Sequence, residues 1–207
     1  MGPSKISQAL LNRLPGYLDY LKNLPGQDHY ISATTIANAL GLGDVQVRKD
    51  LAAISDAGRR RTGRSRDHLI RDIEAYLGFS CAAPTIVVGS SGMGRAFLDY
   101  SGFDHSGLKI LACFDRISHT DHSSRGRPIY PMDQMADYCR SHRIRIAILA
   151  VPVEDAQPVC EELVRCGVQA IWNLSPTHVR VPDGIALRNE SFAASASALL
   201  AQMNNTN

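Results

Sequence analysis

The chain has 207 residues, of which 44% are apolar, 20% charged and 6% aromatic, a composition that excludes a wholly disordered chain. The formal net charge is only +2, which rules out overall charge as an argument for nucleic-acid binding. The longest apolar run, residues 146–153, is about one strand long, whereas a membrane span needs about 20 residues. We therefore expect a soluble, cytoplasmic protein of one or two domains.

The five cysteines are odd in number, and none of them has Cys-x-x-Cys spacing. Neither a disulfide framework nor a metal site is predicted from them, and reduced thiols are typical of a cytoplasmic protein. Cys160 and Cys166 lie on one predicted helix, which leaves a thiol-based redox sensor open as an alternative.

Helical periodicity dominates the first 80 residues, which also carry the basic excess of the chain. Apolar side chains recur at helical spacing over residues 6–21, where Pro15 predicts a break into two segments. Residues 34–40, 44–54 and 67–77 have the same spacing. The N-terminal part is therefore predicted to be all-α.

Capping residues point to a helix-turn-helix motif. Ser32 is the expected N-cap of the helix at 34–40 and Gly41 its stop, while Asp44 is the expected cap of the next helix. Only residues 41–43 separate the two helices, and a short turn containing glycine is typical of this motif.

The second of these helices and the segment after it are strongly basic. Residues 44–66 hold seven basic and three acidic side chains, and the glycines of residues 58–66 suit a short hairpin or wing. Gln46 and Arg48 are the expected readers of base edges, and the wing arginines are expected at phosphates or in the minor groove. The predicted DNA-binding residues are Gln46, Arg48, Lys49, Arg59, Arg60, Arg61 and Arg64.

Strands and helices alternate in the second part of the chain, which predicts a Rossmann-like parallel sheet. Strands are expected at residues 84–89, 108–115, 144–151 and 170–174, and helices at 93–100 and 156–166. A small-residue helix over 192–203 ends the pattern. The predicted organisation is a winged helix-turn-helix domain (1–80), a Rossmann domain (81–191) and a C-terminal helix with its tail (192–207).

A glycine-rich loop joins the first predicted strand of this domain to its helix. Its residues are Gly89, Ser90, Ser91, Gly92, Met93 and Gly94. Such a loop lets a pyrophosphate approach the backbone at a helix N-terminus, and Asp115 at the end of the next strand can accept ribose hydroxyls. Arg116 could instead favour a 2′-phosphate. The simpler alternative is a glycine turn that only joins strand to helix.

The order and spacing of these motifs resemble the Rex family of redox-sensing transcriptional repressors over residues 6–200. The matching segments are 13–18 (RLPGYL), 47–51 (VRKDL), 58–60 (GRR), 88–97 (VGSSGMGRAF), 112–115 (ACFD), 128–130 (PIY), 147–152 (AILAVP) and 173–176 (NLSP).

This resemblance implies a C-terminal helix that is exchanged across a homodimer, and a repressor that binds operator DNA with NAD⁺ and releases it with NADH. It adds Val151, Pro152 and Asn173 to the expected NAD-binding residues. It also implies a polar switch formed by Arg13, Tyr100 and an acid before the last helix. Ser191 stands at the position of that acid, which predicts a weakened, rewired or lost coupling.

Two other functions remain open on the residues alone. An NAD(P)-dependent oxidoreductase would share the glycine loop, but the α/β part leaves little room for a substrate domain and offers no convincing acid–base pair, so no catalytic residue is predicted. A coenzyme A-binding regulator is the second alternative, because a similar loop serves the diphosphate of that ligand.

Overall fold

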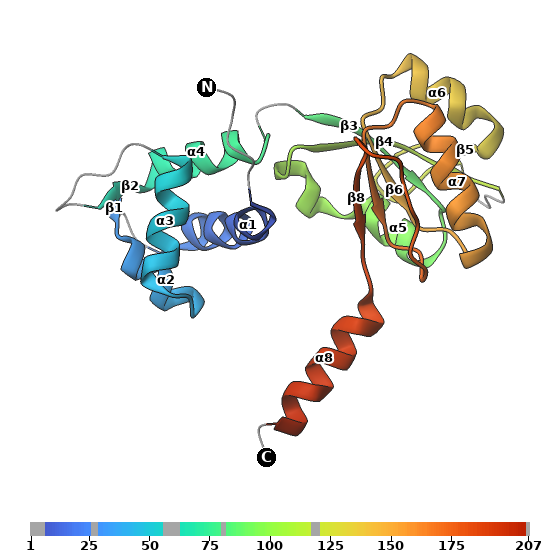
Figure 1. Ribbon diagram of the computed structural model, residues 1–207. Helices are drawn as coiled ribbons and strands as arrows, with labels where there is room; N and C mark the ends of the chain where they lie inside the picture. The colour runs from blue at the N-terminus through green and yellow to red at the C-terminus, as the bar shows by residue number, and fades with distance from the viewer. Residues whose placement is uncertain (1–6, 26–28, 56–62, 80–81, 117–120, 206–207) are drawn as a thin grey trace. The chain divides into compact units, whose positions relative to one another are not determined.

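Residues 7–25, 29–55, 63–79, 82–116 and 121–205 are described by the computed structural model (Figure 1). The chain divides into two units, Met1–Cys81 and Ala82–Asn207, each with its own core. Within the described ranges, no helix has the length and apolar character to cross a membrane.

Four helices enclose the core of the first unit: α1 (Gln8–Asn23), α2 (Ala33–Leu40), α3 (Asp44–Ile54) and α4 (Arg66–Tyr76). The unit is helical as predicted, with the addition of a small antiparallel sheet formed by β1 (Tyr30–Ile31) and β2 (Arg64–Ser65). Apolar side chains from all four helices are buried together, among them Leu14, Tyr17, Leu21, Ile36, Val47, Leu51, Leu69 and Ile73.

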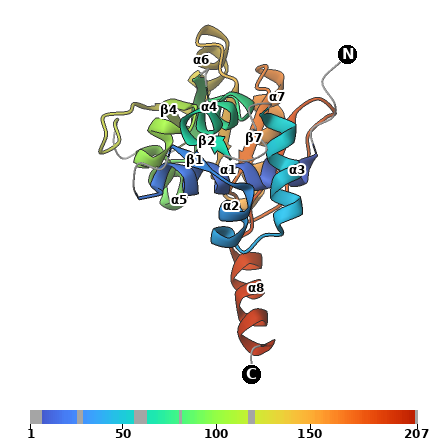
Figure 2. The same ribbon diagram turned by 90° about the vertical axis from the view of Figure 1, so that its left-hand side faces the viewer.

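The helix-turn-helix prediction is confirmed by the ends of α2 and α3. The Ser32 hydroxyl accepts a hydrogen bond from the Thr35 amide at 3.0 Å, and Gly41 ends α2 with a left-handed φ of 65°. The two helices lie side by side in both views (Figures 1 and 2). Asp44 was expected to cap α3, but Gly43 is the N-cap and Asp44 is the first helical residue.

The predicted break at Pro15 is wrong, because α1 continues through it as one helix. Proline has no amide hydrogen to offer the preceding turn, which costs the helix one hydrogen bond. The buried stripe of α1 runs from Leu10 to Leu21 on both sides of Pro15, so a break would withdraw half of it from the core. Burial of this stripe outweighs the lost bond.

A parallel six-stranded sheet forms the second unit, in the spatial order β5-β4-β3-β6-β7-β8. Its strands are β3 (Ala83–Val88), β4 (Leu108–Asp115), β5 (Ile129–Pro131), β6 (Ile146–Leu149), β7 (Ala170–Asn173) and β8 (Ala186–Asn189). Numbered within the unit, this is the order 3-2-1-4-5-6 of Rossmann folds, and it reverses between β3 and β6. The Rossmann-like prediction is confirmed, although the edge strands β5 and β8 were not predicted.

Helices cover both faces of this sheet. Ile86 and Val88 pack in the cluster with α6 (Met135–Ser141) and α7 (Val153–Arg165), whereas Val87 packs with α5 (Gly92–Asp99) and the short 3₁₀ helix Ser101–His105. Successive side chains of a strand point to opposite faces, so burial on both sides explains the continuous apolar run of β3. The last helix, α8 (Phe192–Asn205), follows β8.

Glycine is required where the loop after β3 meets its neighbours. A Cβ atom at Gly94 would lie 1.9 Å from the Gly89 carbonyl oxygen, and one at Gly89 would lie 2.2 Å from the Ala150 carbonyl oxygen. No side chain can occupy either position without movement of the backbone. The loop after β3 is therefore packed directly against the end of β6.

We predict that Gly94→Ala lowers the free energy of unfolding by roughly 1–3 kcal/mol, because the new methyl group overlaps backbone. Gly16→Ala is the control: Gly16 lies inside α1 and a Cβ atom there would meet no neighbour within 4 Å, so this change should raise the free energy of unfolding by roughly 0.5–1 kcal/mol. Urea denaturation measures both changes. A Gly94→Ala protein as stable as the parent would contradict the packing of the loop.

Candidate functional sites

Helix α3 presents a polar face to solvent and an apolar face to the core. Gln46, Arg48 and Lys49 are exposed, whereas Val47 and Leu51 are buried. The three side chains predicted on this helix as DNA contacts are therefore on its outer surface. A helix with this pattern can enter the major groove of a duplex without disturbing its own core.

Each of the two expected base readers is held by an aspartate one turn away on α3. Arg48 Nη2 lies 2.6 Å from an Asp44 carboxylate oxygen, and the Thr34 hydroxyl donates to the other oxygen at 2.8 Å. Gln46 Nε2 donates to Asp50 Oδ1 at 2.8 Å. The partner of Gln46 is a buried carboxylate, whereas the Arg48 side chain stays 67% exposed in its pair with Asp44.

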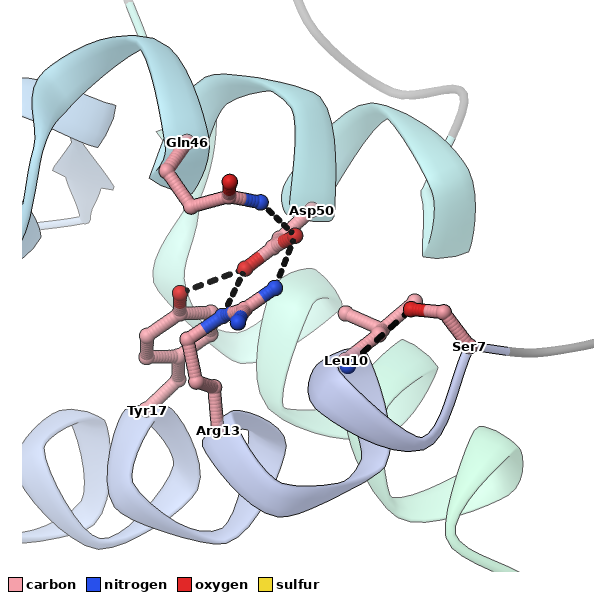
Figure 3. Close-up of polar contacts among 6 residues, drawn as sticks. All are labelled: Ser7, Leu10, Arg13, Tyr17, Gln46 and Asp50. Carbon is pink, nitrogen blue, oxygen red and sulfur yellow. Dashed lines mark hydrogen bonds and ion pairs between the residues drawn. The ribbon is translucent and has the colours of Figure 1, made fainter.

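Asp50 is the centre of a polar network that joins α1 to α3 (Figure 3). Its side chain is buried, and the residue is 4% exposed. Arg13 donates from Nε to Oδ2 at 2.6 Å and from Nη2 to Oδ1 at 2.9 Å. The Tyr17 hydroxyl donates to Oδ2 at 2.7 Å, and with Gln46 the carboxylate accepts four hydrogen bonds.

These contacts determine the charge states of Asp50 and Tyr17. Burial by itself would raise the pKa of Asp50, but the hydrogen bonds from Arg13, Tyr17 and Gln46 lower it below its ordinary value. Burial, and then the hydrogen bond to Asp50, raise the pKa of Tyr17 to about 12. At neutral pH Asp50 is therefore a buried carboxylate and Tyr17 a neutral donor.

The predicted wing lies largely outside the described residues, including Arg59, Arg60 and Arg61. Its last part is β2, which contains Arg64 and pairs with β1. Arg64 is only partly exposed there. Its assignment as a DNA contact stays a prediction.

A cleft of about 560 Å³ opens at the carboxyl ends of β3, β4 and β6. This is the point where the strand order reverses, which is where Rossmann folds bind ligands. Of the residues predicted to bind NAD, those that line it are Gly89, Ser90, Ser91, Asp115, Arg116, Val151 and Pro152. Arg95 and Phe114, which lie in the matching segments 88–97 and 112–115, also line the cleft. So do Met132, Asp155 and Val159, which the sequence did not single out.

Two pairs of polar residues shape the cleft. Asp115 Oδ2 accepts hydrogen bonds from the Ser90 amide and the Ser90 hydroxyl, both at 2.5 Å, so the end of β4 holds the glycine loop. Arg116 Nη1 lies 2.8 Å from Asp155 Oδ1, which joins the end of β4 to the first turn of α7. The arginine considered for a 2′-phosphate is thus paired with a carboxylate.

Asn173 has a different position from the other expected cofactor residues. It is fully buried, and its Nδ2 donates to the Thr177 carbonyl at 2.6 Å and to Asn189 Oδ1 at 2.8 Å. Asn173 therefore ties β7 to β8 and to the following loop. Gly92, Met93 and Gly94 form the first turn of α5, next to the lining residues of the cleft.

The three switch candidates have separate local partners. Arg13 pairs with Asp50 inside the first unit. In the second unit, the Tyr100 ring packs edge-on against Phe103 at a centroid distance of 4.9 Å. The Ser191 hydroxyl accepts a hydrogen bond from the Ala194 amide at 3.2 Å and so caps α8. Serine at this position is explained locally as a helix N-cap.

The four cysteines within the described ranges do not favour the thiol-sensor alternative. Burial raises the pKa of Cys113 and of Cys139 to about 12, and it also raises the pKa values of Cys160 and Cys166. Raised pKa values leave little thiolate, the reactive form, at neutral pH. The fifth cysteine, Cys81, lies outside the described residues.

Comparison with known proteins matches both units. Residues 5–52 match the family described as "Putative DNA-binding protein N-terminus", and residues 82–177 match the family "CoA binding domain". The chain is 34% identical to the redox-sensing transcriptional repressor Rex of Porphyromonas gingivalis, over 97% of this chain and 93% of the relative. It is 35% identical to Rex of Treponema denticola, over 95% and 94%.

Solved structures agree with this match over 98% of the chain. The crystal structure of RSP in complex with beta-NAD⁺ and operator DNA has a TM-score of 0.90 at 28% identity, over 98% of this chain and 94% of that one. RSP in complex with beta-NADH has a TM-score of 0.84 at 28% identity, over 98% and 96%. A helix-turn-helix unit followed by a Rossmann unit defines a two-domain transcriptional regulator. The chain belongs to the Rex family of redox-sensing transcriptional repressors, which confirms the resemblance of its motifs.

The lowered pKa of Asp50 predicts an acid-dependent stability. The charged network contributes fully above the unfolded pKa of about 3.9 and is lost as the pH falls through the lower native value. Asp50→Asn should lower the free energy of unfolding by about 3 kcal/mol at pH 6, and the difference from the parent should shrink below about pH 4. Urea denaturation across this range measures it.

Asp19→Asn, at an exposed position on α1, is the matched control and should differ little from the parent at any of these pH values. A loss at Asp50→Asn that stays constant down to pH 3 would contradict a charged network.

Proposed function

We propose that this protein is a repressor that binds operator DNA through α3 and the wing, and that NADH in the Rossmann cleft weakens that binding. The observation that carries the proposal is the similarity over almost the whole chain to RSP, whose structure contains NAD⁺ and operator DNA. The cleft at the reversal of strand order supports the same function, because it combines a glycine loop with a strand-terminal acid.

In this proposal the glycine loop and the N-terminus of α5 hold the diphosphate, and Asp115 accepts the adenosine ribose hydroxyls. Asp115 already accepts two hydrogen bonds from Ser90, so ribose binding and loop position depend on one carboxylate. Arg116 is paired with Asp155, and this supports NAD(H) over its 2′-phosphorylated form. The chain acts by binding, and no catalytic step is part of the proposal.

We further propose that the protein acts as a homodimer in the cytoplasm and exchanges α8 between its two subunits. Within the described part of the chain, no residue of α8 is buried, although Phe192, Leu199, Leu200 and Met203 are large and apolar. Exposed apolar surface of this kind marks an interface. Two copies of α3 would then contact two half-sites of one operator, about one helical turn apart.

NADH control of operator binding is the first test. We predict sequence-selective binding of two chains per duplex, measured by sedimentation and fluorescence anisotropy, with affinity that falls on addition of NADH but not of NAD⁺. The reason is linkage. A ligand that binds the DNA-free conformer more tightly lowers the affinity for DNA, and DNA lowers the affinity for that ligand by the same factor. Coenzyme A is the control ligand. If the protein binds no duplex at low salt, the proposed repressor function is wrong. If coenzyme A alone changes the affinity for DNA, the result favours a coenzyme A-binding regulator.

Asp115→Asn tests the cleft. We expect NADH affinity in isothermal titration calorimetry to fall roughly 10- to 100-fold, because a neutral amide cannot accept as strongly from the ribose and the Ser90 donors. Asp183→Ala, an exposed acid outside the cleft, is the control and should bind NADH as the parent does. Unchanged affinity in Asp115→Asn would remove Asp115 from the site.

A further inference from the structure

The amide of Gln46 has a defined orientation although the residue is exposed. Its Nε2 donates to Asp50 Oδ1 at 2.8 Å, and its carbonyl oxygen points away from the network (Figure 3). Glutamine amides on a surface can usually rotate by half a turn about the last bond at little cost, and then donor and acceptor exchange places. Here that rotation is opposed by a neighbour.

Asp50 opposes the rotation because a carboxylate only accepts hydrogen bonds. If the Gln46 amide turned over, its carbonyl oxygen would face Asp50 Oδ1 and two acceptors would meet. Arg13 and Tyr17 supply three further donors from α1, so the carboxylate is fixed in place and charged. The donors on α1 thus define which edge of the Gln46 amide faces outward.

The outward edge of this amide carries the carbonyl oxygen and the second hydrogen of Nε2. An acceptor beside a donor is complementary to the major-groove edge of adenine, which offers the N6 donor and the N7 acceptor. Guanine offers two acceptors there and would meet the carbonyl oxygen of Gln46 with its own. The orientation that Asp50 imposes therefore selects between the two purines.

We propose that Asp50 is a specificity-determining positioning residue: by fixing the Gln46 amide, it makes α3 select adenine over guanine at one operator position. This inference rests on the proposed operator binding and on Gln46 as a base reader. Asp50 itself touches no base. Its ion pair with Arg13 also holds α1 against α3, so the test must separate base choice from stability.

The experiment is selection of operators from a randomised duplex library by the full-length protein, followed by Kd measurement on single-base variants. Gln46→Ala first identifies the position whose base preference depends on Gln46. At that position we expect the parent to prefer adenine over guanine about tenfold. Asp50→Asn should reduce this ratio to about threefold or less, because the new amide can donate to Gln46 and let it turn over.

Tyr17→Phe is the matched control. It removes a donor from the same carboxylate, but Tyr17 binds Oδ2 whereas Gln46 binds Oδ1. Tyr17→Phe should therefore lower thermal stability and retain the tenfold preference. In the Gln46→Ala background, adding Asp50→Asn should leave base preference at that position unchanged, as expected for two residues that act through one contact.

The outcomes separate the inference from its premises. A parent protein that selects no duplex refutes operator binding, and a Gln46→Ala protein with unaltered preferences refutes Gln46 as a reader; either result overturns the inference through its premise. If the preference for adenine at the position read by Gln46 stays tenfold in the Asp50→Asn protein, the premises stand and only the inference about Asp50 is wrong. If circular dichroism shows that Asp50→Asn does not fold, the charge-balanced Arg13→Gln/Asp50→Asn protein replaces it, with the same expected loss and the same contradiction.

Discussion

A single buried carboxylate organises the N-terminal unit. Asp50 accepts hydrogen bonds from Arg13, Tyr17 and Gln46, and so connects a helix of the core to the helix with the basic face. Removal of one partner of a buried charge is destabilising, because part of that charge is then left without compensation. The position of α3 and the orientation of its side chains therefore depend on residues that lie 33 and 37 positions earlier in the chain.

The second unit depends on a comparable constraint that is steric. Gly89 and Gly94 leave no space for a side chain between the loop after β3 and the end of β6, and Asp115 holds Ser90 from the end of β4. Three strand ends are thus drawn together around one cleft. A ligand bound in this cleft would therefore contact residues from all three strand ends.

Local chemistry made much of the fold predictable. Ser32 and Gly41 delimit α2, and the β-branched run of β3 and the strand that ends at Asp115 follow from side-chain pattern alone. The edge strands β5 and β8 were not predicted because they are short and only partly buried, which leaves no clear alternation. The break expected at Pro15 failed because burial of the α1 stripe outweighed one local hydrogen bond.

The motifs of the candidate sites can be recognised in the sequence, but the side-chain contacts between distant residues cannot. The glycine loop and Asp115 follow from spacing, but the pairs Arg13–Asp50 and Arg116–Asp155 join residues far apart in the chain, and no local signal specifies them. In the sequence, Asp50 is one residue of the matching segment 47–51. Only the fold shows that its carboxylate accepts four hydrogen bonds. The resemblance indicates only that Ser191 stands where an acid is expected, whereas in the structure its hydroxyl caps α8.

The most direct test of this account is a crystal structure of the full chain bound to its selected operator at a resolution that defines the Gln46 amide. We expect Asp50 to remain on Arg13 and Tyr17, with Nε2 of Gln46 on Asp50 and its carbonyl oxygen on the N6 amino group of an adenine. A Gln46 side chain directed away from the bases, or an Asp50 carboxylate released into solvent while α3 occupies the groove, would contradict it.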